Sequence, residues 1–324
     1  MKYKAFGKTG LRVSQVALGT GNFGTGWGYG ANPDDAAAVF NSYADAGGNF
    51  IDTADVYQFG QSEELLGQLL QGRREDFILA TKFTDGATPG GNRLVTGNSR
   101  KAMVASVEAS LRRLKTDRID IYWAHRPDGI TPAEELVRGF EDLARAGKIL
   151  YAGLSNFSAW QLARTVTIAE LTRVVPIAAA QFEHSLVQRE PEADLFPASH
   201  ALGLGIVTWS PLGGGMLTGK YRLGEKGREE GFGGRVFRSE NSAHRTQVLN
   251  TVLEIAAEHG VSAGQVAIAW AGTHGAVPIL GPRTPSQLID NLGATTLTLT
   301  DEQISMLDTV SSTTAHSPVR TPLP

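Results

Sequence analysis

Short apolar runs alternate with longer helical patterns from one end of the chain to the other. Eight such runs lie at residues 16–18, 50–51, 77–80, 119–123, 149–154, 177–180, 206–208 and 277–280. Helical patterns separate many of them, at residues 34–46, 100–114, 132–146, 159–173 and 247–259. This alternation is typical of repeated βαβ units around a parallel sheet. Since eight strands fit a closed barrel better than an open sheet of five or six, we predict a (β/α)₈ TIM barrel.

The N-terminus carries a different pattern. Residues 2–6 and 11–13 flank a glycine-bounded turn at residues 7–10, which predicts a small β-hairpin that covers the barrel bottom. A chain of 324 residues allows one to three domains, but an α/β barrel uses about 250 residues or more as one unit. Because no low-complexity linker divides the chain, we predict a single domain over residues 1–324.

Composition excludes several classes of protein. The formal net charge is -3, without a basic stripe, which argues against nucleic-acid and membrane-surface partners. The chain has no cysteine, so disulfides and thiolate metal sites are excluded, and its seven histidines form no HExxH pattern. The N-terminus lacks the apolar segment of a secretory signal, and no run approaches 18 apolar residues. We therefore expect a cytoplasmic protein without a metal site.

Four proton-active side chains follow three successive strands of the predicted barrel. Asp52 ends the second strand, Tyr57 lies in its loop, Lys82 ends the third strand and His125 follows the fourth. Taken singly, such an Asp is more often a turn or cap residue, and such a Lys or His usually lies on the surface. However, the carboxyl ends of barrel strands form one rim, where active sites lie. We therefore expect these four groups to meet and to perturb one another's pKa values.

These four groups suggest a mechanism of proton transfer. A free phenol, with a pKa near ~10, is a poor acid–base catalyst at neutral pH. A buried Lys82 ammonium would lower the pKa of Tyr57, and Asp52 would keep Lys82 charged and oriented. Tyr57 would then donate the proton, while His125 would hydrogen-bond and polarise a substrate carbonyl.

Longer motifs surround these residues. They are 47-GGNFIDTADVY-57, 79-LATK-82, 120-DIYWAHRPD-128, 153-GLSNF-157, 209-WSPLGGG-215 and 281-GPRTPSQ-287. Along essentially its whole length, the chain resembles the aldo-keto reductase superfamily. The segment 209–212 with Lys220 and Tyr221 is most similar to the branch of bacterial reductases and potassium-channel β-subunits. The resemblance implies the same four catalytic residues, which agrees with the interpretation above.

The resemblance also implies a nicotinamide cofactor, NADPH, with NADH as the lesser alternative. In this interpretation Ser155, Asn156 and Gln181 hold the carboxamide, and Trp209 stacks on the nicotinamide ring. The remaining cofactor contacts are assigned to Thr20, Gly21, Asp52, Ser210, Pro211, Leu212, Gly214, Lys220, Arg235, Gly281, Arg283, Gln287 and Asn291.

The adenosine end of this site has a physical signature of its own. Thr284, Pro285 and Gln287 form the pattern of a capping box with proline at the first helical position. A helix N-terminus there would favour an anion, and Arg283 beside it could pair with a 2′-phosphate, favouring NADPH. The alternative is that Thr284 only begins a helix and that Arg283 is solvated.

Two glycine-rich segments suggest other nucleotide sites. Residues 19–24 satisfy G-x-G-x-x-G after a strand, but the helix that should begin within the motif begins only near Pro33. Residues 214–220 approach a P-loop, but Tyr221 stands where Ser or Thr is required, so an NTPase is excluded. We interpret the first as a barrel loop near the nicotinamide. We interpret the second as part of a long irregular loop, 213–244, which covers the pyrophosphate through Lys220 and Arg235.

The predicted function is therefore reversible NADPH-dependent reduction of aldehydes or ketones to alcohols, by hydride transfer with Tyr57 as general acid. One alternative is an NADP(H)-binding regulatory subunit with slow turnover, and another is an NADP⁺-dependent alcohol dehydrogenase. For the small-molecule substrate, Phe23, Trp27 and Tyr29 are candidate pocket residues beside Tyr57 and His125. Trp123 fits barrel packing better. The sequence does not indicate the oligomeric state.

Overall fold

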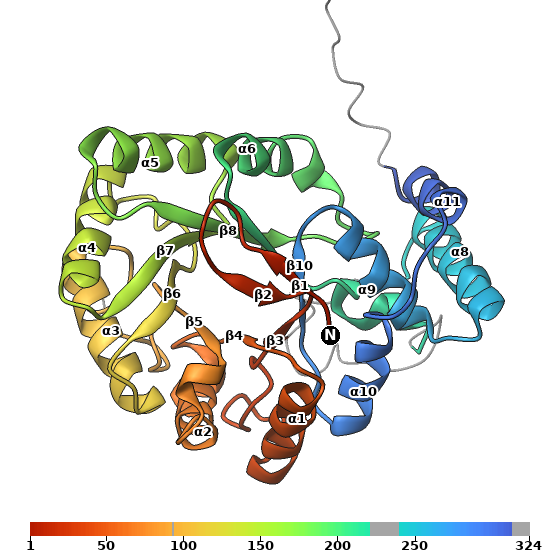
Figure 1. The fold of residues 1–324 in the computed structure, drawn as a ribbon, viewed down its shortest axis with the longest axis horizontal. Coiled ribbons are helices and arrows are strands. Elements are labelled where there is room, and N and C mark those ends of the chain that lie inside the picture. The colour runs from red at the N-terminus through yellow and green to blue at the C-terminus, as the bar shows by residue number, and fades with distance from the viewer. Residues whose placement is uncertain (93, 221–239, 313–324) are drawn as a thin grey trace, which may run out of the picture.

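Eight parallel strands close into a barrel in the computed structural model, which describes residues 1–324 except 93, 221–239 and 313–324. Around the barrel the strands follow the order β10-β3-β4-β5-β6-β7-β8-β9 (Figure 1). Their bounds are β3 Ala17–Gly19, β4 Phe50–Asp52, β5 Ile78–Phe83, β6 Ile119–Ala124, β7 Ile149–Ser155, β8 Ile177–Glu183, β9 Gly205–Trp209 and β10 Val277–Leu280. The predicted (β/α)₈ barrel is confirmed, and each of the eight apolar runs lies within one residue of a strand or inside it.

Helices surround the barrel (Figure 1). They are α1 Pro33–Asp45, α2 Gln61–Leu69, α3 Arg100–Leu114, α4 Ala133–Arg145, α5 Ala159–Thr172, α6 Leu195–Leu202, α8 Ala243–His259, α9 Ala263–Thr273, α10 Pro285–Gly293 and α11 Asp301–Ser311. Short 3₁₀ turns are η1 Tyr57–Gly60, η2 Arg74–Asp76, η3 Glu190–Glu192 and η4 Gly213–Thr218. Side-chain caps fix several helix starts, as where Ser158 and Gln161 form a capping box at α5.

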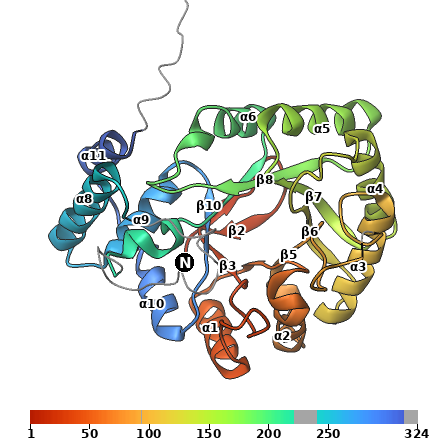
Figure 2. The same ribbon diagram turned by 180° about the vertical axis from the view of Figure 1, so that it is seen from behind.

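The predicted N-terminal hairpin is also confirmed. Strands β1 (Tyr3–Ala5) and β2 (Arg12–Ser14) pair antiparallel, and the Lys8 N–H donates to the Gly203 carbonyl just before β9. Gly7, at φ +55°, lies so close to this backbone that an added Cβ would be 2.4 Å from the Gly205 nitrogen. The hairpin therefore seals the amino end of the barrel, the end facing the viewer in Figure 1, whereas Figure 2 shows the opposite end.

The barrel interior is filled by large apolar side chains. Trp123 is fully buried there with Phe50, Ile121 and Val207. An added Cβ on Gly153, opposite Trp123 on the neighbouring strand, would lie 2.4 Å from the indole ring. The interpretation of Trp123 as a packing residue is therefore correct. Within the described residues, no helix is both long and apolar enough to cross a membrane.

Unusual backbone angles gather at the carboxyl ends of the strands. Positive φ values occur at Gln58 and Phe59 after β4, Thr84 after β5, Asn156 after β7 and Ser210 after β9. Non-glycine residues seldom adopt such angles, and they persist mainly where the surrounding structure enforces them, often at functional sites. The rim predicted to hold the site is thus also a place where ordinary backbone preference is overridden.

Candidate active site

Asp52, Tyr57 and Lys82 form one connected hydrogen-bond chain at the rim. The Lys82 ammonium is fully buried and forms a short ion pair with Asp52 Oδ1. It also donates to the Thr53 carbonyl at 2.8 Å and to the Tyr57 hydroxyl at 3.1 Å. An ammonium has three N–H donors, so every donor of Lys82 is used inside the protein.

The barrel register brings these residues together. Asp52 at the end of β4 is paired with Ala80 on β5, two residues before Lys82, and Tyr57 begins η1 in the loop that follows β4. Backbone bonds from Thr53 N–H to the Ala80 carbonyl and from Asp55 N–H to the Lys82 carbonyl extend the strand pairing into this loop. The loop is consequently held against β5, and Tyr57 is held beside Lys82.

Burial and neighbouring charges shift the pKa values of Tyr57 and Lys82 in opposite directions. Burial raises the pKa of Tyr57 above its ordinary value, and the nearby Lys82 ammonium offsets only part of that rise. Lys82 therefore lowers the pKa of Tyr57 as expected, but the opposite effect of burial is larger. Burial also disfavours the Lys82 ammonium, yet Asp52 and Tyr57 together raise the pKa of Lys82. Tyr57 is thus a protonated phenol at neutral pH, beside a stable cation.

His125 lies beside Tyr57, with the two rings edge to face and their centroids 6.0 Å apart. Its backbone N–H donates to the Phe83 carbonyl and to Thr84 Oγ1, so the residue is fixed to the end of β5. Burial, followed by the Lys82 and Arg126 charges, lowers the pKa of His125 well below its ordinary range. The imidazole is therefore neutral at neutral pH.

Four predicted carboxamide and ring contacts meet on the next strands. Asn156 donates to the His125 carbonyl at 2.9 Å and to Ser155 Oγ at 3.0 Å, while its Oδ1 accepts from Trp209 Nε1 at 3.1 Å. The Trp209 ring is thereby held at the rim. Gln181 is buried and donates to Asp52 Oδ2 at 3.0 Å, which joins it to the proton-active chain.

In the loop after β3, Gly21 borders the site, whereas Thr20 is buried. A Cβ on Gly21 would lie 3.7 Å from the Tyr57 ring, so this glycine backbone borders the phenol. Thr20, by contrast, is fully buried, and its hydroxyl contacts Ser62 Oγ at 2.8 Å. The predicted cofactor contact of Thr20 stays a prediction, and its hydroxyl already has a partner in α2. As predicted for a barrel loop, the next helix begins only at Pro33.

Ser210, Pro211, Leu212 and Gly214 form a tight turn after β9. The Gly214 N–H donates to Ser210 Oγ at 3.2 Å, and three successive glycines at 213–215 have positive φ. Lys220 is exposed at the end of this segment, and Arg235 lies outside the described residues, as does most of the predicted long loop. The loop boundary at 244 is wrong, because Ser242 caps α8 and helix begins at Ala243.

The predicted adenosine end lies at the N-terminus of α10. Thr284 caps this helix by accepting from the Gln287 N–H, and Pro285 is at the first helical position. The reciprocal half of the capping box is wrong: Gln287 Oε1 accepts from the Arg283 N–H instead, at 2.8 Å. The Gly281 carbonyl accepts from Asn22 Nδ2, and Asn291 is buried on α10. Among the described residues, no acidic side chain forms an ion pair with Arg283.

Aromatic side chains surround Tyr57 on the outer side. The Trp27 ring lies edge to face with Tyr57 at 6.1 Å and tilted against Tyr29 at 6.2 Å. Phe59, which sequence reasoning missed, also packs edge to face on Trp27 at 6.4 Å. The prediction that Phe23 lines the pocket is wrong, because Phe23 is fully buried in the core between strands and helices.

Sequence reasoning also missed a group of buried charged residues next to the hydrogen-bond chain of Asp52, Lys82 and Tyr57. Glu63 on α2 accepts from Thr81 Oγ1 at 2.6 Å and from Arg113 Nε at 2.7 Å. Asp55 is buried nearby, and neither of its carboxylate oxygens forms a hydrogen bond of normal geometry. Asp55 lies within the motif that ends at Tyr57, but sequence gives no sign that Glu63 and Arg113 come to its side.

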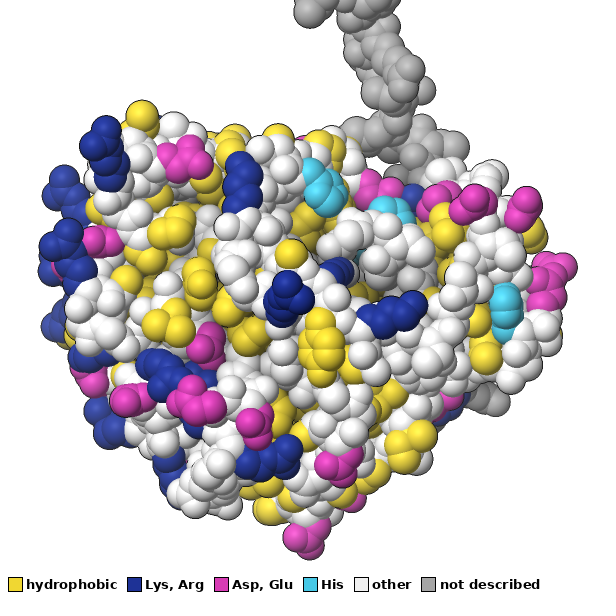
Figure 3. Space-filling view, viewed as in Figure 1, with side chains coloured by type: hydrophobic (Ala, Val, Ile, Leu, Met, Phe, Trp, Pro, Cys, Tyr) yellow, Lys and Arg dark blue, Asp and Glu magenta, His cyan; other side chains and the backbone are white. Residues whose placement is uncertain are grey.

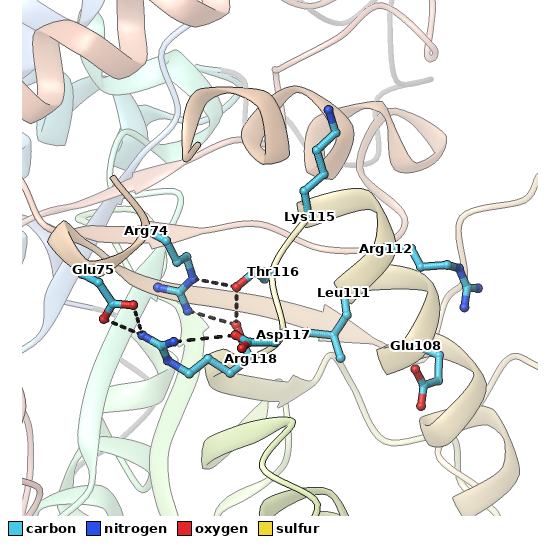
Figure 4. Close-up of a pocket in the computed structure, with 9 residues that line it drawn as sticks. All are labelled: Arg74, Glu75, Glu108, Leu111, Arg112, Lys115, Thr116, Asp117 and Arg118. Atoms are coloured by element: carbon cyan, nitrogen blue, oxygen red, sulfur yellow. Dashed lines mark hydrogen bonds and ion pairs between the residues drawn. The ribbon is translucent and has the colours of Figure 1, made fainter. Parts of the chain in front are cut away.

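Other polar clusters lie away from this rim. A hollow of about 740 Å³ is lined by the end of α3 and by η2, at the amino end of the barrel (Figure 4). Its Arg74 and Arg118 guanidinium groups are paired with Asp120 and Glu75, and Lys115 points away from them. On the same end of the molecule, Lys and Arg gather over the α3 to α5 edge among acidic side chains (Figure 3). This mixed surface offers charge but no convergent acid–base group.

His184, Glu192 and His274 bring ligand-type atoms within 4.8 Å of one another. However, Arg189 donates to both carboxylate oxygens of Glu192 and lies over the Trp270 ring, 4.8 Å from its centroid. His184 Nε2 contacts Glu192 Oε1 at 2.7 Å. Since a guanidinium already neutralises the carboxylate, this cluster is best described as an arginine-centred structural network joining η3 to α9.

The barrel and its rim define a class of protein. The sequence model of the Aldo/keto reductase family matches residues 15–312, so the chain belongs to that family. This membership supports an oxidoreductase that acts on small molecules with a nicotinamide cofactor.

Particular relatives refine the comparison. The chain is 35% identical over 321 residues to an uncharacterised oxidoreductase, YrpG, of Bacillus subtilis (strain 168), with 96% of each chain covered. It is also 35% identical over 325 residues to a probable voltage-gated potassium channel subunit beta of Oryza sativa subsp. japonica, again with 96% of each covered. Norsolorinic acid reductase of Aspergillus flavus is 32% identical over 311 residues, 92% of this chain and 78% of that protein. These relatives match the predicted branch.

Proposed function

We propose that the protein is an NADPH-dependent reductase of aldehydes or ketones, with Tyr57 as the general acid. The observation that carries the proposal is the buried chain from Asp52 through Lys82 to the Tyr57 hydroxyl. A protonated phenol with a cation behind it, at the open end of a barrel, is suited to donate a proton to a carbonyl oxygen. We further propose that residues 1–324 act as a single domain.

Each residue of the chain has a distinct task in this proposal. Lys82 donates to the phenol oxygen, so the Tyr57 proton points away from Lys82 and toward the substrate oxygen. As that proton leaves, the ammonium stabilises the phenolate, and Asp52 holds the ammonium in place. His125 lies beside Tyr57 and hydrogen-bonds the same substrate oxygen. When bound, the reduced nicotinamide supplies the hydride that adds to the carbonyl carbon.

The residues present fit such a cofactor. Asn156 and Trp209 form a fixed polar and aromatic wall, which would hold the carboxamide and face the ring. Ser155 and Gln181 lie beside this wall but already have partners in Asn156 and Asp52. The backbone of the 210–214 turn would approach the pyrophosphate, where glycines leave room for it.

Arg283 supports the preference for NADPH. It precedes the capped N-terminus of α10, where backbone N–H groups and the helix dipole favour an anion. A guanidinium with no acidic partner among the described side chains is available to pair with a 2′-phosphate. Gln287 and Asn291 on the same helix would contact the adenosine.

The direct test is NADPH oxidation, followed at 340 nm, across a panel of aldehydes and ketones, with the reverse reaction measured on the matching alcohols. Purified wild type should turn over at least one carbonyl, and Tyr57→Phe should lose most of that turnover. Absence of turnover with every substrate, despite tight NADPH binding, would contradict the proposal.

A second candidate function rests on the rice relative, whose name is that of a probable channel subunit. In that case the protein would bind NADP(H) chiefly as a regulatory partner and turn over slowly. The complete hydrogen-bond chain at Tyr57 favours catalysis, because a binding role alone does not require a buried ammonium behind a phenol. The same assay separates the two, since a regulatory subunit would bind cofactor tightly but reduce carbonyls slowly.

A further inference from the structure

The amino end of the barrel carries a hollow between the N-terminal hairpin and α9. Its volume is about 440 Å³. Apolar side chains form much of its wall, among them Val16, Ile268, Leu297 and Leu299, and Lys2 and Lys4 line it on the hairpin side. Small-molecule sites have this size and this composition, with a few polar groups in a mostly apolar wall.

Lys4, on β1, is a partly buried cation without a counter-charge. Its ammonium donates to the Gly275 carbonyl at 3.0 Å and to the Ala276 carbonyl. An ammonium has three N–H donors, so the third has no protein partner among the described residues. No carboxylate in the described part of the chain forms an ion pair with Lys4. Burial lowers the pKa of Lys4 to about 8, because an ammonium held away from water is disfavoured.

The groups around Lys4 are basic rather than acidic. Residues 1–33 contain Lys2, Lys4, Lys8 and Arg12 but no Asp or Glu. Lys2 lies two residues before Lys4, where the Lys2 carbonyl extends the hairpin pairing, so both side chains project to the same side. Lys8 and His200 line, together with Lys4, an adjoining hollow of about 330 Å³. Lys and Arg side chains lie near the centre of this end of the molecule, over the hairpin (Figure 3), and their charge favours an anion.

We propose that this hollow is a second ligand site, which binds a small carboxylate with an apolar body, such as a fatty acid of medium chain length. The apolar wall receives the hydrocarbon, and the carboxylate accepts the remaining N–H of Lys4. Both features are needed, because the cation selects an anion and the apolar wall selects against inorganic ions. The site lies at the opposite end of the barrel from Tyr57, so it is separate from the proposed reductase function and requires no cofactor.

Gly272 provides a way to fill the hollow without touching Lys4. This residue lies on α9 and lines the hollow, and an added Cβ there would have no neighbour within 4 Å. A leucine at this position therefore occupies open space rather than displacing the core. Since leucine also favours a helix more than glycine does, Gly272→Leu should fold.

The primary test is isothermal titration calorimetry of the full chain with sodium octanoate at pH 7. Wild type should bind octanoate, and Lys4→Met should weaken binding by about 10- to 100-fold, the range of a hydrogen bond to a charged group. Gly272→Leu should weaken it at least as much. Lys101→Met, at an exposed lysine near the start of α3 on the opposite end of the barrel, should change nothing. No binding, or binding that Lys4→Met and Gly272→Leu leave unchanged, would overturn the proposal.

Two further probes test the chemical class of the ligand. Inorganic phosphate carries charge without an apolar body, and 1-octanol carries the apolar body without charge. Both should bind much more weakly than octanoate. Phosphate that binds as tightly as octanoate would show that only charge is recognised, and an equal affinity for 1-octanol would show that only apolar surface is recognised. Either result would overturn the proposal.

Proton linkage gives a readout in the wild-type protein that does not depend on how any variant folds. With a pKa of about 8, Lys4 is about nine-tenths charged at pH 7 and about one-tenth charged at pH 9. The affinity of wild type for octanoate should therefore fall about tenfold over this range, whereas that of Lys4→Met should stay constant. A bound carboxylate also raises the pKa of Lys4, so binding at pH 8 should take up about half a proton. Calorimetry in buffers of different ionisation enthalpy measures this uptake, and binding without it would overturn the contact with Lys4.

Discussion

The Tyr57 hydroxyl lies 3.1 Å from the Lys82 ammonium, and Lys82 is the donor in that hydrogen bond. Because an ammonium has no lone pair, the phenol oxygen must accept, and the phenol's own hydrogen is free for another partner. The other two donors of Lys82 are held by Asp52 and by the Thr53 carbonyl. The geometry therefore gives the phenol proton a direction as well as an electrostatic environment.

Tyr57→Phe should reduce kcat by about 10²- to 10⁴-fold, the usual contribution of general acid catalysis. The phenyl ring keeps the contact with Trp27, so cofactor affinity should change little. Steady-state kinetics and NADPH titration by fluorescence measure the two quantities. Near-normal kcat in this variant would remove Tyr57 from the mechanism.

Asp52→Leu should lower the free energy of unfolding by about 3–5 kcal/mol, because it leaves the fully buried Lys82 ammonium without a counter-charge. Combining it with Lys82→Met should recover much of that loss, since an apolar pair replaces the buried ion pair. Urea denaturation measures both variants. A double variant as unstable as the sum of the single variants would show that the pair is held by packing rather than by charge.

Arg283→Ala should weaken NADPH binding by about 1.5–3 kcal/mol, as expected for a hydrogen bond to a charged group. NADH binding should change little, because only NADPH carries the 2′-phosphate. Arg112→Ala, a change to an exposed arginine on α3 at the opposite end of the barrel, is the matched control and should change the affinity for neither cofactor. Equal losses for NADPH and NADH would assign Arg283 to the shared adenosine or to the fold.

Sequence predicted the barrel and the meeting of Tyr57 with Lys82 because both follow from strand register, which apolar runs reveal. It did not predict that burial would outweigh Lys82 in setting the pKa of Tyr57. Phe23 was wrongly assigned to the pocket because an aromatic residue in a loop can turn either way, and here it joins the core. Glu63 and Arg113 were missed because their position beside Asp55 depends on contacts made by two different helices, α2 and α3.

Asp55 provides the last prediction, because it is an acid buried without a hydrogen-bond partner of normal geometry. Burial, and then the neighbouring Glu63 carboxylate, raise its pKa from 3.8 to about 8, although Arg113 opposes the rise. The folded protein therefore holds this proton more tightly than the unfolded chain does. The resulting contribution to the free energy of unfolding is present in full below pH 4. It is lost as the pH rises toward 8, because in that range Asp55 ionises freely only in the unfolded state.

Asp55→Asn, which is uncharged at every pH, should remove this dependence. One pKa unit corresponds to about 1.4 kcal/mol, so between pH 6 and pH 8 the variant should gain about 2 kcal/mol of unfolding free energy relative to wild type. Urea denaturation at pH 6, 7 and 8 measures the difference, and Asp142→Asn, at a partly exposed ion pair with Arg100, controls for loss of a carboxylate. A difference that stays constant across this range would show that Asp55 is ionised in the folded protein, with Arg113 as its counter-charge.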